Sequence, residues 1–162
     1  MKIKANNVDY KLNEVEENNI TLEGIETIDW KYGSELAANF LSINFEDVSE
    51  MLYALEDIEE IDPSEETLEN ALILVNEYYS DKTVYFCLQQ LSDEEIVVFE
   101  DVDSFLLNGL SMLANLDEEE KENIIYFLDV DKLLNSLENN GEIFISDNGK
   151  VFRLDFQGEQ RK

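Results

Sequence analysis

The chain contains no histidine, one cysteine, one proline and six glycines in 162 residues. Without histidine it lacks the side chain that most often serves as general base, zinc ligand or catalytic-triad member. The scattered glycines form no phosphate-binding loop of the Walker type. Paired carboxylates could hydrolyse glycosidic bonds, but among 39 acidic residues such pairs arise by chance. We therefore expect a protein that is not an enzyme and has no cofactor.

The single cysteine, Cys87, lies in the apolar run 84–88. A lone thiol forms no intrachain disulfide, which fits a reducing compartment. With no histidine nearby to activate it, Cys87 is expected to fill the core rather than act as a nucleophile. No stretch approaches the ~20 apolar residues that span a bilayer, and the first residues have no apolar signal segment. We expect a cytoplasmic protein that does not contact membranes.

Basic residues are scarce: eleven Lys and Arg stand against 39 Asp and Glu, for a formal charge of −28. Self-repulsion on this scale opposes a compact state unless a positively charged partner uses the charge. Duplex DNA carries one charge per ~1.7 Å of axis, so 28 charges match about 14 base pairs. Nine Phe and seven Tyr argue against a disordered acidic tail. The composition favours a folded DNA mimic over a merely soluble or halophilic surface.

The charge is concentrated in the middle of the chain. Residues 44–103 contain nineteen acidic residues and one base, Lys82, whereas residues 139–162 contain four of each. Two copies that met through the neutral C-terminal region would not repel each other. This region is therefore the candidate surface for a homodimer.

The N-terminal segment reads as strands. Residues 3–12 resemble a hairpin around Asn6-Asn7, and residues 20–30 alternate apolar and polar side chains. A short helix is expected after Gly33, with Ser34 as its N-cap.

The middle segment reads as helical. Apolar residues from Phe45 to Ile58 recur at spacings of three and four, with Asn44 as the expected N-cap. A second helix is expected to restart at residues 62–66, with Pro63 in its first turn. Residues 84–91 fit a strand or a helix equally, and residues 96–100 favour a strand.

The C-terminal segment mixes helices and strands. Helices are expected after Asp101 or Asp103, from Asp117, and around residues 133–137. Asn148-Gly149 between two apolar, β-rich runs indicates a closing hairpin. The expected class is α+β: N-terminal strands in 1–43, an acidic helical region in 44–92, and a C-terminal α+β region in 93–162.

Two Asp-x-Asp pairs begin like calcium-binding loops, at Asp101 and Asp129. Neither has the glycine and the final glutamate that an EF-hand needs at its sixth and twelfth positions. We interpret both as helix caps and expect no metal site.

On the acidic helix faces, the Lys residues that usually stand four positions along the helix from an Asp or Glu are missing. Like charges at three- and four-residue spacing are slightly destabilising, so we interpret them as phosphate substitutes that bind a partner. The candidate set is Glu46, Asp47, Glu50, Glu56, Asp57, Glu59, Glu60, Glu65, Glu66, Glu69, Asp93, Glu94, Glu95, Glu100, Asp101 and Asp103.

Three runs carry a resemblance to a known family. They are residues 111–119 (Ser-Met-Leu-Ala-Asn-Leu-Asp-Glu-Glu), 126–134 (Tyr-Phe-Leu-Asp-Val-Asp-Lys-Leu-Leu) and 143–153 (Ile-Phe-Ile-Ser-Asp-Asn-Gly-Lys-Val-Phe-Arg). In this order they resemble the last domain of the ArdA anti-restriction proteins. Residues 45–81 with 93–103 look like the helical middle domain and linking strand of that family. Residues 1–43 do not show the signature of its first domain.

The resemblance implies a homodimeric mimic of bent DNA that occupies the DNA groove of Type I restriction-modification enzymes. Such a protein binds a DNA-binding protein and does not itself bind nucleic acid. Two alternatives remain open on the same composition: an immunity protein that neutralises a nuclease toxin, and an anti-CRISPR inhibitor of an RNA-guided nuclease.

Overall fold

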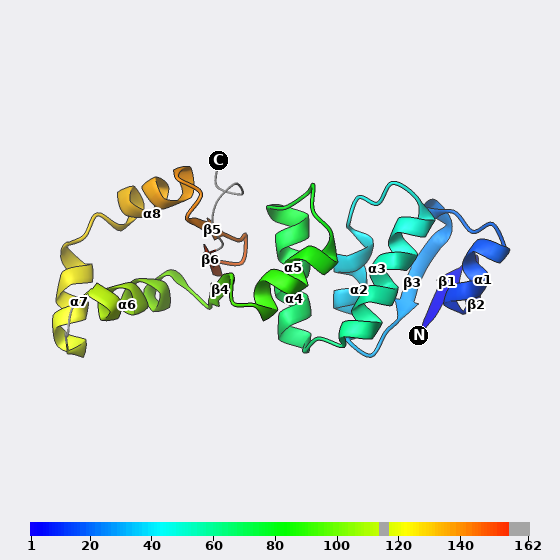
Figure 1. Cartoon of the computed structure of the whole chain (residues 1–162), viewed down its shortest axis with the longest axis horizontal. Coiled ribbons are helices and arrows are strands. Elements are labelled where there is room, and N and C mark those ends of the chain that lie inside the picture. Colours follow the sequence, from blue (N-terminus) through cyan, green and yellow to red (C-terminus); the bar gives the residue numbers. More distant parts are fainter. Residues whose placement is uncertain (114–116, 156–162) are drawn as a thin grey trace. The chain divides into compact units, whose positions relative to one another are not determined.

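A computed structural model of the protein describes residues 1–113 and 117–155, and the chain divides into two compact units, 1–89 and 90–162. Helices and two small antiparallel sheets make up the fold, which confirms the α+β class (Figure 1). Residues 1–43 and most of the acidic segment 44–92 therefore share one unit.

The first unit combines a three-stranded sheet with helices. Its elements are β1 (Lys2–Ala5), β2 (Val8–Tyr10), α1 (Leu12–Glu17), a 3-10 turn (Leu22–Gly24), β3 (Ile25–Asp29), α2 (Ser34–Leu41), α3 (Val48–Ile61), α4 (Glu65–Glu77) and α5 (Val84–Ser92), whose last residues lie beyond the division between the units. The strand order is β2-β1-β3, and all pairs are antiparallel.

The predicted N-terminal hairpin is confirmed. Asn6 and Asn7 both have positive φ, 53° and 62°, which is the conformation that a two-residue hairpin turn requires. Ile3 on the central strand pairs with Tyr10 on one side and Ile28 on the other. Ile3 and Ile28 are buried, so one face of the sheet forms part of the core.

Two expected N-caps are wrong. Helix α2 begins at Ser34 itself, after Gly33, whose φ of 96° is readily available only to glycine. Helix α3 begins at Val48 rather than after Asn44, because the Asp47 carboxylate accepts a 2.9 Å hydrogen bond from the Glu50 N–H.

The structure also corrects the start of a second helix and decides between strand and helix for residues 84–91. Ser64 caps α4, so Pro63 lies before the helix and not in its first turn. Residues 84–91, for which strand and helix were both open, form α5. Its buried residues Val84, Cys87 and Leu88 stand at helical spacing.

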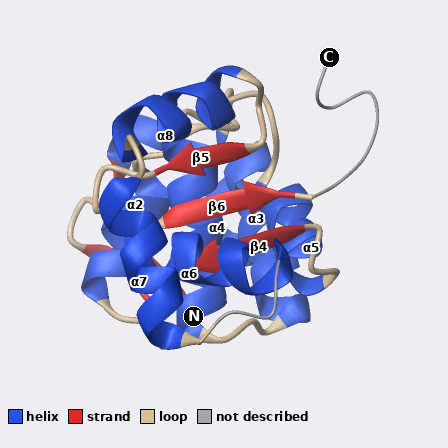
Figure 2. Ribbon diagram, turned by 90° about the vertical axis from the view of Figure 1, so that its left-hand side faces the viewer, coloured by secondary structure: helices blue, strands red, loops and turns tan. Residues whose placement is uncertain are grey.

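The second unit is built on a small antiparallel sheet. Its elements in the described residues are β4 (Ile96–Phe99), α6 (Val102–Leu113), α7 (Glu118–Phe127), α8 (Val130–Asn139), β5 (Ile143–Ile145) and β6 (Val151–Leu154). Strand β6 lies between β4 and β5 (Figure 2). Leu134 from α8 packs with Ile143 and Val151 from the sheet to form its core.

Acidic residues cap the helices of this unit. Asp101, Asp117 and Asp129 each accept a hydrogen bond from the backbone N–H three residues later, at 2.8, 2.8 and 3.2 Å. The caps predicted at Asp101 and Asp129 are confirmed, and Asp103 lies inside the first turn of α6. The predicted closing hairpin is also confirmed, with Gly149 at a φ of 88° in its loop.

Within the described residues, no helix combines the length and apolar character needed to cross a bilayer.

The core of the first unit generates a stability prediction. Leu55 on α3 is fully buried, and Leu55→Ala should lower the free energy of unfolding by about 2–5 kcal/mol because it leaves a cavity. Its neighbour Glu56 is exposed, so Glu56→Ala should change stability by less than about 0.5 kcal/mol. Urea unfolding followed by the fluorescence of Trp30, the single tryptophan, reports on this unit directly. Equal effects of the two substitutions would contradict the packing of α3.

Candidate protein-binding surface

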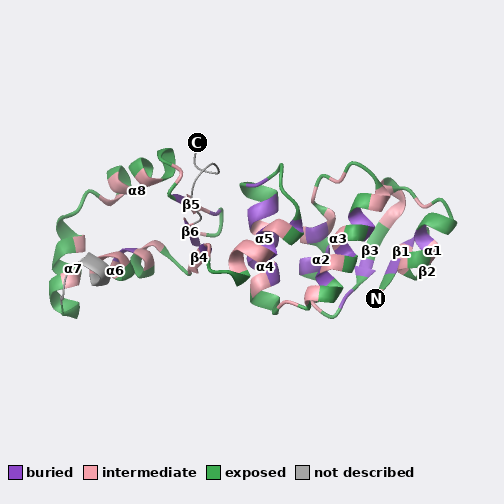
Figure 3. Ribbon diagram, in the orientation of Figure 1, coloured by how far each residue is buried: buried purple, intermediate pink, exposed green. Residues whose placement is uncertain are grey.

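Helix α3 separates an apolar face from an acidic one. Met51, Leu52, Leu55 and Ile58 are buried (Figure 3). The other face exposes four carboxylates, which are those of Glu50, Glu56, Glu59 and Glu60. The predicted amphipathic helix is therefore present, and its polar face carries acidic side chains without a compensating base.

Most of the predicted partner-binding residues are exposed. Thirteen of the sixteen have exposed side chains, and only Asp57, Glu69 and Glu95 are half-buried. They do not form one continuous helix face. Glu46 and Asp47 precede α3, and residues 93–95 lie between α5 and β4. The ten residues from 46 to 69 belong to the first unit and the remaining six to the second.

Some of these acids also stabilise the fold. Asp47 caps α3, and the Glu50 carboxylate in turn accepts a 2.7 Å hydrogen bond from the Glu46 N–H. Asp101 caps α6, and the N–H of Ser104 lowers the pKa of its carboxyl group. Carboxylates at helix N-termini are favoured by the helix dipole. Part of the acidic pattern therefore has a structural cause that is independent of any partner.

The remaining acidic surface is not neutralised locally. Between Lys31 and Lys82 the chain contains fourteen Asp and Glu residues and no Lys or Arg. The pKa of Asp57 is raised by desolvation and by the nearby Glu60 carboxylate. Repulsion of this kind is relieved when a cationic surface approaches.

An exposed tyrosine lies in the middle of this acidic face. Tyr53 is 67% exposed and is flanked at helical spacing by Glu50, Glu56 and Asp57. Tyr53 and Tyr85 line the same 140 Å³ pocket, together with Glu50 and Asp57. Tyrosine is enriched at interface hot spots. The charge pattern did not reveal Tyr53, although its position off the apolar stripe of α3 could have done so.

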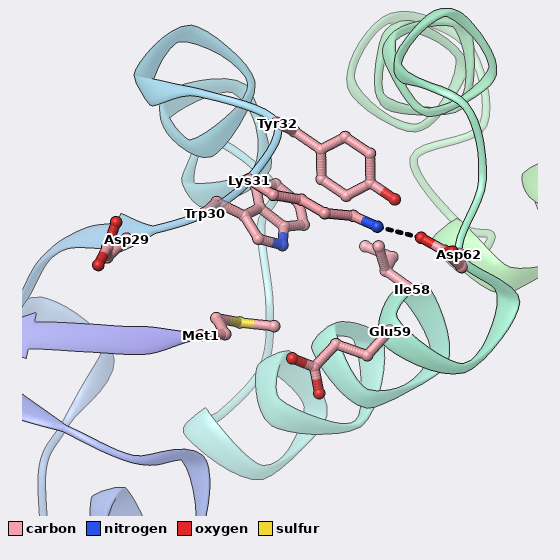
Figure 4. Close-up of a pocket in the computed structure, with 8 residues that line it drawn as sticks. All are labelled: Met1, Asp29, Trp30, Lys31, Tyr32, Ile58, Glu59 and Asp62. Carbon is pink, nitrogen blue, oxygen red and sulfur yellow. Dashed lines mark hydrogen bonds and ion pairs between the residues drawn. The ribbon is translucent and has the colours of Figure 1, made fainter.

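A larger cavity of about 490 Å³ lies in the first unit, between the end of β3 and the C-terminal end of α3 (Figure 4). An ion pair joins Lys31 and Asp62 across its edge, and the Tyr32 hydroxyl donates a 2.8 Å hydrogen bond to the Pro63 carbonyl. The ion pair raises the pKa of Lys31 and lowers that of Asp62, while desolvation raises the pKa of Tyr32. The sequence had given none of these residues a role in binding.

The second unit exposes apolar contact area in addition to its acidic side chains. Phe105, Leu110, Ile124 and Leu133 help to line a wholly apolar groove of about 470 Å³ between α6, α7 and α8. Close by in sequence, at the end of α7, Phe127 is 84% exposed. Exposed apolar patches of this kind are typical of protein interaction sites.

The structure supports the expected role of Cys87. The side chain is fully buried, and burial, with a smaller contribution from Asp81, raises the pKa of its thiol to about 12. Such a thiol is a poor nucleophile at neutral pH.

The described residues contain no group of three or more side chains arranged to hold a metal ion. No family model, curated protein or solved structure matches this chain.

The double role of Asp47 can be tested. Asp47→Ala should lower the free energy of unfolding by about 1 kcal/mol, because the Glu50 N–H loses its capping acceptor. Glu46→Ala removes the same charge, but Glu46 takes part in the capping contacts through its backbone N–H, so it should leave stability nearly unchanged. Thermal unfolding of the two variants at one pH makes the comparison. Equal destabilisation by the two substitutions would indicate that the removed charge, and not the lost cap, causes the loss of stability.

Proposed function

We propose that this protein is a non-enzymatic, cytoplasmic inhibitor that imitates DNA and occupies the DNA-binding cleft of a defence enzyme, with Type I restriction-modification enzymes as the target class. The supporting observation is the exposed carboxylate surface of residues 46–69, which is carried on folded helices and contains no base. The resemblance to the ArdA proteins points to the same target class.

The proposed mechanism is electrostatic substitution. A DNA-binding cleft presents Lys and Arg side chains that contact phosphates. Carboxylates such as Glu56, Glu60 and Glu66 are exposed on helices, so they can replace phosphates without a large ordering cost. Affinity is spread over many contacts, and loss of one carboxylate weakens binding only modestly.

We also propose that the protein forms a homodimer through its neutral C-terminal region, residues 139–162. The support is the balance of four acidic and four basic residues there, in a chain that otherwise repels its own copies. A dimer would double the length of acidic surface that a DNA-binding cleft meets.

Competition for a DNA cleft tests the proposed function. A labelled DNA duplex is loaded onto a purified Type I methyltransferase, and its fluorescence anisotropy is followed as the protein is added at two salt concentrations. Mimicry predicts near-stoichiometric displacement that raised salt weakens. Failure to displace DNA at tenfold excess would contradict the restriction-enzyme target and direct the same assay to nuclease toxins and RNA-guided nucleases.

Two matched charge-removal variants locate the active surface. Replacing Glu56, Glu60 and Glu66 together by Gln should weaken displacement about tenfold, because three phosphate substitutes are lost. Replacing Glu17, Glu23 and Glu35 by Gln removes the same charge from other exposed positions. If this control loses as much activity, net charge rather than the helical surface is responsible.

The mass in solution tests self-association. Light scattering after gel filtration should give twice the 18.8 kDa chain mass over a range of concentrations. Phe127→Ser removes an exposed aromatic side chain of α7, which lies outside the neutral region, and should leave the mass unchanged. Conversion to a monomer by this substitution would move the interface to α7, and a monomeric wild type would contradict the dimer.

A further inference from the structure

The cavity in the first unit combines aromatic walls with carboxylates. Trp30 and Tyr32 at the end of β3 pack edge to face, with ring centroids 5.2 Å apart. Glu59 and Asp62 at the C-terminal end of α3 form the opposite side (Figure 4). At about 490 Å³, the space is large enough for an amino-acid side chain and its adjoining peptide groups.

Trp30 presents an unused hydrogen-bond donor to this space. Its side chain is 8% exposed and is held in place by edge-to-face contacts with Tyr32 and Phe40. Within the described residues, the indole N–H donates no hydrogen bond, and Figure 4 shows its nitrogen facing the region between Met1 and Ile58. The described residues contain no buried side-chain nitrogen or oxygen without a partner, so this N–H is open to solvent at the cavity. An acceptor atom on a ligand would satisfy it.

The opposite side of the cavity already holds a cation. The Lys31 ammonium pairs with Asp62 and lies 5.2 Å from the centre of the Tyr32 ring. Glu59 adds a second exposed carboxylate to the lining of the cavity, and in Figure 4 it points toward Met1. The local chemistry therefore accommodates a positive charge next to an aromatic face.

We propose that this cavity binds an arginine residue of the protein partner. Its guanidinium group would contact Glu59 and Asp62 and stack near Tyr32, and its backbone carbonyl would accept from the Trp30 N–H. A planar guanidinium suits a carboxylate and an aromatic ring better than an ammonium does. The inference rests on the proposed function in one respect, namely that the partner's surface is basic.

Lys31 then acts as an internal competitor. The Lys31 and Asp62 side chains are 65% and 64% exposed, and such pairs contribute little to stability. An incoming guanidinium can replace the ammonium at Asp62 at small cost. Removal of Lys31 should therefore strengthen ligand binding.

The single tryptophan makes the cavity directly observable. N-acetyl-arginine amide is titrated into the full-length protein while tryptophan fluorescence is excited selectively. We expect a saturable change with a Kd of about 1 mM, since one residue makes few contacts. N-acetyl-citrulline amide has nearly the same shape without the charge and should bind at least tenfold more weakly. Absence of a saturable change, or equal binding of the two probes, would overturn the proposal.

Matched variants separate the cavity from the general acidic surface. Glu59→Gln should weaken probe binding about tenfold, because a charged partner is lost, whereas Glu60→Gln removes the same charge from the next residue, which does not line the cavity. Lys31→Met should tighten binding severalfold, and Lys82→Met should not. Equal effects within either pair would mean that the probe senses net charge only, and the site would be rejected.

The probe assay does not use the defence enzyme, so the two proposals can fail separately. Saturable, Glu59-dependent probe binding without displacement of DNA would keep the cavity and reject the restriction-enzyme target. Displacement of DNA without probe binding would keep the mimicry and reject the cavity.

Discussion

Repulsion among 39 carboxylates is the constraint to which the rest of the structure responds. Ion pairs join Lys31 to Asp62, Lys121 to Glu118 and Arg153 to Asp155, but the chain has only eleven Lys and Arg residues for these carboxylates. Salt bridges cannot compensate a charge of −28, so the fold depends on buried apolar side chains and on helix N-caps. Because Asp side chains cap four of the described helices, part of the excess negative charge stabilises the helices against the repulsion that it creates.

The sequence predicted the elements whose pattern is local. Asn6-Asn7 and Asn148-Gly149 tolerate the positive φ angles that tight turns need, and each marks a hairpin. Helix starts were harder, because several polar residues precede each helix and the tertiary packing selects one of them. Gly33 and Asp47 were selected in place of Ser34 and Asn44. Residues 84–91 were ambiguous because an almost wholly apolar segment shows no clear period, and only its buried face identified a helix.

The candidate site was predictable in its charge and not in its shape. Exposure of thirteen of the sixteen acids follows from amphipathic helices, since carboxylates avoid burial. Tyr53, the cavity beside Trp30 and the apolar groove of the second unit depend on residues that are distant in sequence. These features matter for mechanism, because diffuse charge attracts any basic surface, whereas an aromatic side chain or a shaped cavity discriminates among partners.

The position of Lys31 shows how a single base is used in an acidic unit. Asp62 ends α3 in a left-handed conformation with a φ of 50°, where its carboxylate lies near the negative end of the helix dipole. That arrangement is unfavourable unless a cation is close, and Lys31 is the only Lys or Arg between residues 12 and 81. Its ammonium is thus placed at the helix end that most needs it, rather than among the exposed acids of α3. A guanidinium group of the partner that replaced this ammonium would neutralise the same carboxylate at the end of α3. Exchange of one cation for the other would therefore leave α3 stable while the partner is bound.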